Sequence, residues 1–336
     1  SKEDSQTMKF VMRHGLVAAL LSTSAFTFAA GSNESTKTSY AAMAASNATA
    51  DTIRSHITGL FYGGTSFSRL SPSQNGDRAA AWDEGQVSYS VTPTIVSIRN
   101  KLDPLHNSGK VGVVVTGIEH FDEIDTMMGI TLSIDTLNVT SSDVSNGIAS
   151  AVNTAVRGKG FTLAPYFAKQ LESGWLFDAS VGLGSSSLKT NTQGTTATPS
   201  TSRMFLSAGF SKVEEVFDDS VLLSTKLTAS HSIDSVKAFV LSDATAMSSS
   251  KSVLTQLKGG AGLSWPGEDG TPYVEATFLI NDFSATGGGS VKPREHSTAV
   301  SARVGYRVIK GDIYGDFSTQ FERDKTRFQL YVGRRF

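Results

Sequence analysis

From Gly85 onward, hydrophobic and polar side chains alternate along the chain with a period of two. In the segment WLFDASVGLG, which begins at Trp175, apolar side chains occupy every second position, and small or charged side chains lie between them. The segments that begin at Ser220, Tyr273 and Val300 repeat this pattern. Because successive side chains of a β-strand point to opposite faces, the alternation predicts strands with one apolar and one polar face.

The pattern predicts about twelve strands, an even number that is typical of bacterial membrane barrels. Several of them exceed the roughly five or six residues that are usual in globular sheets and reach the roughly ten that a tilted strand needs to cross a bilayer. The expected strands are residues 85–99, 110–119, 125–137, 158–170, 174–188, 201–213, 219–231, 252–265, 271–284, 296–309, 312–322 and 327–336.

The connections between these strands alternate between short and long. The short connections are residues 171–173, 214–218, 266–270 and 310–311, and the long ones are 138–157, 189–200, 232–251 and 285–295. A membrane barrel has tight periplasmic turns and longer outer loops, whereas a soluble sandwich has no reason to segregate them. The sequence therefore predicts an all-β fold, a closed antiparallel transmembrane β-barrel. Two features fit less well, namely Pro93 in the first strand and the short last outer connection near Asp324.

The last ten residues, RFQLYVGRRF, have the pattern of a closing strand. A closed barrel needs its last strand to pair with its first, because an open edge cannot be satisfied in lipid. We therefore expect residues 327–336 to pair with residues 85–99. The apolar residues expected to form the lipid-facing closure and assembly signal are Phe328, Leu330, Val332 and Phe336.

Residues 8–30 have the three parts of a secretory signal peptide. Lys9 and Arg13 precede an apolar run over residues 16–28, and small residues follow up to Ala30. That run is too short to span a bilayer as a helix, which takes about 20 residues. We expect cleavage near Ala30 after export through the Sec translocon, and residues 1–7 are treated as upstream sequence.

An Ala-rich segment between the signal and the first strand has helical spacing. Ile53, Ile57 and Leu60 recur on one face, and a pair of glycines follows. This predicts a helix over residues 49–61, with a less certain extension back to Tyr40. Its small side chains suit a barrel lumen, and the alternative is a helix packed on the periplasmic surface. Residues 31–84 are thus expected to be a helix-containing linker or vestigial passenger, and residues 85–336 the barrel.

The central hairpin carries a family resemblance. The segment GKGFTLAPYFAKQLESGWLFDASVGLGSSSLKT, residues 158–190, joins a Gly-aromatic strand through a G-W turn to a D-A-S-x-G-x-G strand. With MMGITLSID upstream, TPYVEATF downstream and the terminal Phe336, it resembles the translocator domain of bacterial autotransporters. The passenger segment, residues 31–83, is shorter than usual for that family, and Arg334 departs from the usual closing pattern.

The resemblance implies a monomeric barrel in the outer membrane of a Gram-negative bacterium, surrounded by outer-membrane lipid. It also implies insertion by the barrel-assembly machinery, a helix in the lumen, and translocation or anchoring of an N-terminal segment at the cell surface. The alternative is a passive porin-like or adhesin-like barrel that acts through its extracellular loops.

Composition and motifs narrow the function classes. Lys and Arg number 30 against 31 Asp and Glu, so the chain lacks the basic footprint of a nucleic-acid-binding protein. The sequence contains no Cys, which excludes disulfides and thiolate metal sites. Catalytic, nucleotide-binding and metal motifs are also missing from it. We therefore expect no enzyme activity, no cofactor and no metal site.

Eight charged residues fall on the polar phase of the predicted strands. A Lys or Arg facing lipid at mid-depth would cost about 2–4 kcal/mol, so these side chains should face the lumen. Mutual ion pairs that plug a narrow barrel are the simpler expectation, and contact with a helix or a translocating polypeptide is the alternative. The eight residues are Asp178, Lys226, Lys258, Glu275, Arg303, Arg307, Asp316 and Glu322.

Overall fold

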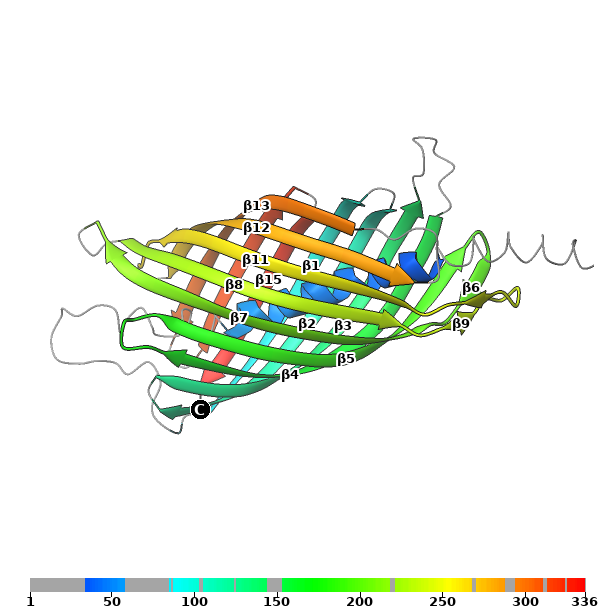
Figure 1. Cartoon of the computed structure of the whole chain (residues 1–336). Helices are drawn as coiled ribbons and strands as arrows, with labels where there is room; N and C mark the ends of the chain where they lie inside the picture. Colours follow the sequence, from blue (N-terminus) through cyan, green and yellow to red (C-terminus); the bar gives the residue numbers. More distant parts are fainter. Residues whose placement is uncertain are drawn as a thin grey trace, which may run out of the picture.

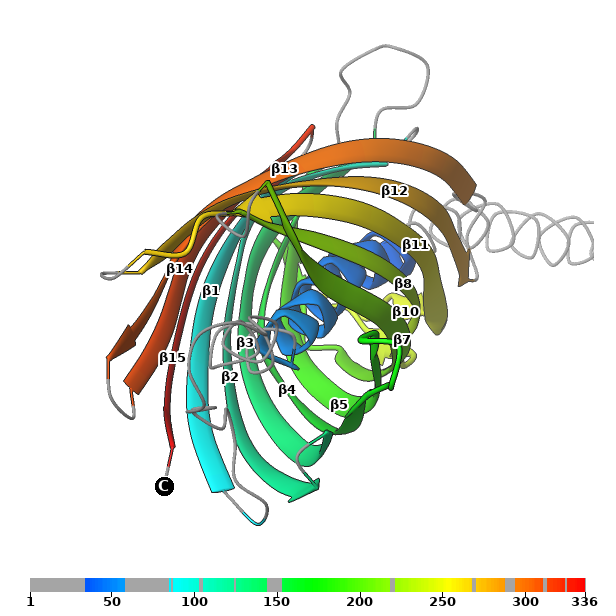
Figure 2. The same ribbon diagram turned by 90° about the vertical axis from the view of Figure 1, so that its left-hand side faces the viewer.

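The computed structural model describes a closed β-barrel with one helix inside it (Figures 1 and 2). The described residues are 34–57, 85, 87–102, 105–123, 125–143, 153–217, 221–267, 270–287, 294–310, 313–323 and 325–335. The predicted signal peptide, Leu60 and Phe336 lie outside these ranges. Within the described residues, no helix is long and apolar enough to span a membrane.

Twelve long strands form the barrel wall. They are β1 (Val87–Leu102), β2 (Leu105–Glu123), β3 (Thr126–Asp143), β4 (Asn153–Gln170), β5 (Leu176–Thr192), β7 (Ser200–Val216), β8 (Val221–Val236), β11 (Ser250–Ser264), β12 (Thr271–Gly287), β13 (Arg294–Lys310), β14 (Ile313–Glu322) and β15 (Lys325–Arg335). Each pairs antiparallel with its neighbours along the chain, and β15 pairs with β1. Closure leaves no long strand with an open edge, as a membrane requires. The predicted twelve-stranded barrel is confirmed.

The strands are longer at the outer end than the sequence predicts. The expected loop 138–157 shortens because β3 continues to Asp143 and β4 begins at Asn153. Of the other long connections, 189–200 contains β6 (Thr195–Ala197), and 232–251 contains a small hairpin of β9 (Phe239–Val240) and β10 (Ala246–Met247). Beyond the hydrocarbon layer a strand needs no apolar face, so the alternation that marks strands in the sequence ends before the strands do.

The closing seam contains the irregularity that Pro93 predicts. The ladder between β1 and β15 skips Thr92 and Pro93, whereas the ladder between β1 and β2 runs through both residues. Proline has no backbone N–H to donate, so its place is beside a gap in a ladder. The β1–β15 ladder therefore closes the barrel on both sides of a gap of two unpaired residues.

The two faces of the wall differ as a membrane barrel requires. On β15 the apolar Phe328, Leu330 and Val332 face outward and are 43–49% exposed, while Gln329 and Tyr331 are buried inside. Large apolar side chains are exposed in the same way on all twelve long strands. An apolar belt of this extent is unfavourable in water and fits the hydrocarbon layer, so the barrel spans a membrane.

Inward aromatic rings lie over glycines of neighbouring strands. A Cβ atom added to the glycine would lie only 1.9–2.4 Å from the ring, so these positions have no room for a side chain. The bare backbone lets bulky rings pack flat against the inner wall of a narrow barrel. The ring and glycine pairs are Tyr166 with Gly129, Phe205 with Gly182, Tyr273 with Gly305, and Tyr314 with Gly333.

The helix covers residues 34–57 and runs along the lumen (Figure 2). Twenty of its 24 residues are buried. The predicted start at residue 49, or at Tyr40 with the extension, is wrong, because the described helix already includes residue 34. Residues 34–39 are Ser, Thr, Glu and Lys, which carry no apolar period, so their helical state depends on polar contacts with the wall. Residues 58–61 of the predicted helix lie outside the described ranges.

Candidate functional site in the barrel lumen

The first turn of the helix is fixed at the end of the barrel that carries the long connections. The Glu34 carboxylate accepts hydrogen bonds from Thr154 Oγ1, at 2.7 Å, and from Thr192 Oγ1. Thr154 lies at the outer end of β4, and Thr192 is the last residue of β5, at the same end of the barrel. Ser250 Oγ, at the outer end of β11, donates to the carbonyl oxygen of Ser35 at 2.7 Å. In a membrane barrel the long connections are extracellular, so this end of the helix lies at the outer mouth.

The last turn is fixed near the opposite, short-turn end. His56 is fully buried, its Nε2 lies 2.8 Å from Glu119 Oε1, and its Nδ1 lies 3.1 Å from Thr92 Oγ1. A Cβ at Gly117 would come within 2.4 Å of His56 Nε2, so glycine provides the space that the imidazole occupies. The helix therefore runs from the outer mouth at residue 34 towards the periplasmic mouth at residue 57 (Figure 1).

One face of the helix packs against an apolar wall. Ala41, Ala45, Ala48, Ile53 and Ile57 are buried in a single hydrophobic cluster. The small alanines let the helix approach the strands closely, and burial of apolar surface favours its retention in the lumen. The wall side of this cluster comes mainly from β1 to β5 and includes Val96, Val111, Val113, Val115, Leu137, Val139, Val156 and Leu188.

The opposite face of the helix carries charge. Asp51 contacts the ammonium of Lys258 on β11, and its other oxygen lies 2.8 Å from Arg327 Nη2 on β15. Arg54 lies 3.2 Å from both carboxylate oxygens of Asp178 on β5. These pairs bind the helix to both sides of the lumen and fix its rotation about its own axis.

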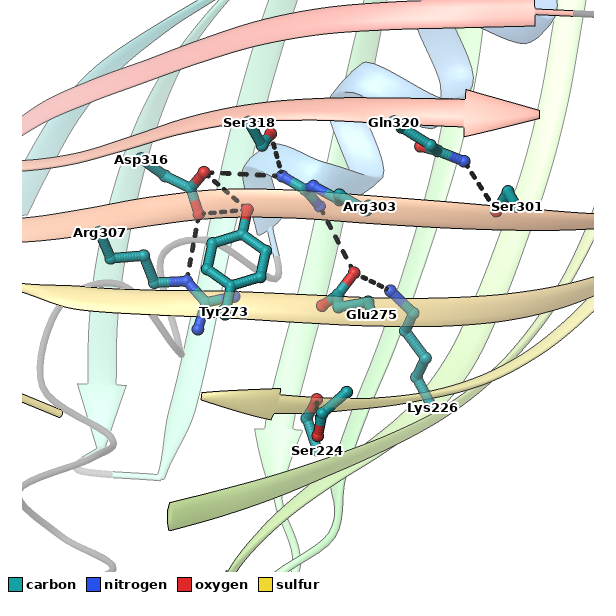
Figure 3. Close-up of polar contacts among 11 residues, drawn as sticks. Ser224, Lys226, Tyr273, Glu275, Ser301, Arg303, Arg307, Asp316, Ser318 and Gln320 are labelled. Carbon is teal, nitrogen blue, oxygen red and sulfur yellow. Dashed lines mark hydrogen bonds and ion pairs between the residues drawn. The ribbon is translucent and has the colours of Figure 1, made fainter. Parts of the chain in front are cut away.

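A network of charges covers the inner wall from β8 to β14 (Figure 3). Glu275 accepts a hydrogen bond from Lys226 Nζ at 2.7 Å, and Asp316 lies 3.1 Å from Arg307 Nε. The Arg303 guanidinium lies between these two carboxylates, 3.9 Å from Glu275 and 3.7 Å from Asp316. Two carboxylates thus serve three cations.

Tyr273 completes the network. Its hydroxyl donates to Asp316 Oδ1 at 2.8 Å, and the Arg307 guanidinium lies 4.0 Å from the ring centroid. Such stacking favours a cation over the ring face. The ring, the carboxylate and the guanidinium fix each other in position against the wall.

The structure places all eight of the charged residues singled out from the sequence on the lumen side of the wall. Asp178 and Lys258 contact the helix. Glu322 lies 3.5 Å from Lys325 and borders a cavity. The other five, Lys226, Glu275, Arg303, Arg307 and Asp316, form the network of Figure 3. Of the helix residues singled out, Ile53 and Ile57 are fully buried against the wall.

Sequence reasoning missed the charged partners on the helix and several on the wall. The strand residues could have been found from their position on the polar phase. The charged residues of the helix could have been found only if the sequence had been searched for a polar face opposite to the face of the isoleucines. The missed residues are Asp51, Arg54, His56, Glu119, Asp135, Arg203, Asp234 and Arg327.

Two cavities lie beside the charged face of the helix. The outer cavity has a volume of about 280 Å³ and is bordered by Tyr40, Met43 and Asn47 of the helix. The inner cavity has a volume of about 120 Å³ and is bordered by Asp51 and Arg54. In the part of the chain that the structure describes, no group of three or more His, Asp or Glu side chains is arranged to hold a metal ion. The described part of the lumen thus binds the helix and contains two small cavities beside it.

Comparisons with known proteins give a fold match and no sequence match. No family model matches the chain, and no curated protein sequence does. Among solved structures, the translocator domain of the autotransporter NalP from Neisseria meningitidis aligns with a TM-score of 0.58 at 12% identity, covering 85% of this chain and 98% of that domain. The transport unit of the autotransporter AIDA-I from Escherichia coli aligns with a TM-score of 0.54 at 11% identity, covering 83% and 96%.

At these identities the likeness concerns the fold alone. The chain has the fold of autotransporter translocator domains, so the fold that the resemblance implied is confirmed. Together with its outward apolar belt, this fold makes the chain a β-barrel of the outer-membrane type.

Proposed function

We propose that the barrel holds, and during assembly delivers, the chain that precedes residue 34 at the cell surface. The observation that carries this proposal is the direction of the lumenal helix. Its first turn is bonded to the outer ends of β4, β5 and β11, and its last turn to β1 and β2 near the periplasmic end. A polypeptide that enters the lumen in this direction has its N-terminal part outside.

The contacts of the helix favour anchoring over free passage in the mature protein. A segment in transit needs a lumen that it does not bind, whereas this helix has polar partners at both ends and apolar packing between them. Removal from the lumen would expose that apolar surface to water. We therefore interpret the helix as the resting state of the barrel, left in place after the preceding chain has reached the surface.

The structural neighbours support this proposal by analogy only. NalP and AIDA-I are autotransporters, and their translocator units share the barrel architecture. Export through the Sec translocon, insertion by the barrel-assembly machinery and a monomeric state are further parts of the proposal, as is the absence of enzyme activity. The predicted signal peptide before residue 31 supports the first of these.

An epitope insertion tests the direction of the helix in the membrane. A short epitope is placed between Asn33 and Glu34, after the predicted cleavage site, and the chain is expressed in a Gram-negative host. Antibody should bind the epitope on intact cells, and external protease should remove it. Protection of the epitope until the outer membrane is permeabilised would refute the proposal.

A matched control uses the same epitope in a short turn. Gly267 and Gly270 bond to each other between β11 and β12, at the end of the barrel opposite to residue 34. An epitope inserted there should be accessible only after permeabilisation. Correct folding of both proteins is checked by heat-modifiable migration in detergent, so that loss of display is distinguished from loss of the barrel.

A further inference from the structure

Among the described residues, two cavities lie between one side of the helix and the barrel wall. Residues of the helix that border the two cavities recur at helical spacing and make one continuous face, which adjoins the alanine face at Ala48. The partly exposed residues of the helix all belong to this face. The face consists of Tyr40, Met43, Ala44, Asn47, Ala48, Asp51, Arg54 and Ser55.

The two cavities meet at a single ion-pair cluster. Arg327 borders both of them, and its partner Asp51 also contacts Lys258. The outer cavity continues towards Arg323 and Glu295 near the outer mouth, and the inner cavity towards Arg307 near the short-turn end. Between the two cavities, Asp51 spans from the helix to β11 and β15.

The wall of this path carries an excess of positive charge. At the constriction one carboxylate, Asp51, faces two cations, and in the network of Figure 3 two carboxylates face three. Lys226 and Arg303 keep 31% and 16% of their side-chain surface exposed within the lumen. A net excess of positive charge among the described residues that line a narrow, low-dielectric passage favours anions and disfavours cations.

We propose that the barrel conducts small inorganic anions along the cavity face of the helix, past the contact of Asp51 with Lys258 and Arg327. The helix stays in place, so conduction is a function separate from surface anchoring. The conductance is small because the path is confined to one side of the lumen, and the Asp51 cluster limits it.

Planar lipid bilayers with the purified full-length protein test this proposal. Under a potassium chloride gradient the reversal potential should show that chloride permeates better than potassium. Asp51→Asn removes the negative charge of the carboxylate that spans the path. Conductance and chloride preference should each rise at least about twofold, because one unit charge acting on an ion through water over about 8 Å changes its local concentration by about that factor. Asp243→Asn, the same chemical change in the exposed turn between β9 and β10, should change neither quantity.

A disulfide between the helix and the wall distinguishes conduction beside a bound helix from conduction through a lumen that the helix has left. Ser39 Oγ and Ser252 Oγ lie 2.5 Å apart, and the chain has no other cysteine, so Ser39→Cys with Ser252→Cys can tie the helix to β11. Conductance that persists after oxidation supports the proposal. A silent wild-type protein, preference for potassium, loss of conductance on oxidation, or equal behaviour of Asp51→Asn and Asp243→Asn would overturn it.

Discussion

Replacement of Arg54 by Ala tests whether ion pairs seat the helix in the lumen. The Arg54 guanidinium lies 3.2 Å from both oxygens of Asp178, whose side chain is only 2% exposed. Arg54→Ala leaves that carboxylate buried without the cation it faces. When the helix leaves the lumen, by contrast, water can reach the same carboxylate.

The expected increase in helix displacement follows from the cost of leaving the Asp178 carboxylate buried without its partner. Removing one partner of a buried ion pair costs about 3–5 kcal/mol. Arg54 keeps 13% of its side-chain surface exposed, and the inner cavity beside it can admit water, so we expect the lower end of that range. At 1.36 kcal/mol per factor of ten, about 3 kcal/mol corresponds to a roughly 150-fold increase in the population of the displaced helix.

Thiol labelling measures that population, because the chain contains no cysteine. Ser46 is buried on the helix, and Ser46→Cys introduces a nearly isosteric reporter. Its labelling rate under native conditions is proportional to the fraction of time that the helix is displaced. In the Arg54→Ala background the rate should rise by about 150-fold, with the barrel still heat-modifiable.

The double variant Arg54→Ala with Asp178→Asn is the matched control. Replacing both members of a buried pair is far less costly than stranding one of them, so labelling should return to within about tenfold of the parent rate. Equal labelling rates in the single and double variants would show that the unpaired Asp178 carboxylate does not cause the displacement of the helix. An unchanged rate in Arg54→Ala would refute the idea that this pair seats the helix.

Two further predictions concern the wall. Gly305→Val should abolish the heat-modifiable barrel, because a Cβ there would lie 2.3 Å from Tyr273 Cζ, whereas Gly259→Ala, with a nearest contact at 3.9 Å, should assemble normally. Phe317 is 57% exposed on the lipid face of β14, so Phe317→Lys should destabilise the barrel by about 2–4 kcal/mol in denaturant titrations in lipid, and Phe317→Leu should be nearly neutral. A stable Gly305→Val barrel or a neutral Phe317→Lys variant would contradict the assigned faces.

The strands are the part of the fold that the sequence determines most clearly. A membrane-spanning strand must be apolar on one face and can be polar on the other, so residues such as Phe328 and Gln329 reveal both the element and its orientation. Outside the hydrocarbon layer this constraint ends. Serines and threonines of β3 and β4 continue the ladder there, and Ser142 Oγ donates to Asn153 at 2.7 Å, with no signal in the hydrophobic pattern.

The helix and its contacts were less predictable for a related reason. Its first half is stabilised by wall residues far away in sequence, such as Thr154 and Ser250, so local periodicity could not set its start. The inward phase of the wall charges was predictable from alternation. Their pairing was not, because it depends on how deep the helix lies in the barrel, and the positions of Asp51 and Arg54 against β11 and β5 follow only from that depth.

The two proposed roles depend on Asp51 to different degrees, and this makes them separable. Anchoring depends on the alanine face and on the contacts at Glu34 and His56, in addition to the ion pairs of Asp51 and Arg54. Asp51→Asn keeps a side-chain oxygen that can accept from Lys258 or Arg327 and leaves the other contacts of the helix in place, so conductance should change while an epitope before residue 34 stays on the surface. Arg54→Ala should act on both, because a displaced helix opens the lumen and loosens the anchor together. Loss of surface epitope in Asp51→Asn, with the barrel intact, would mean that the charged face itself holds the anchor.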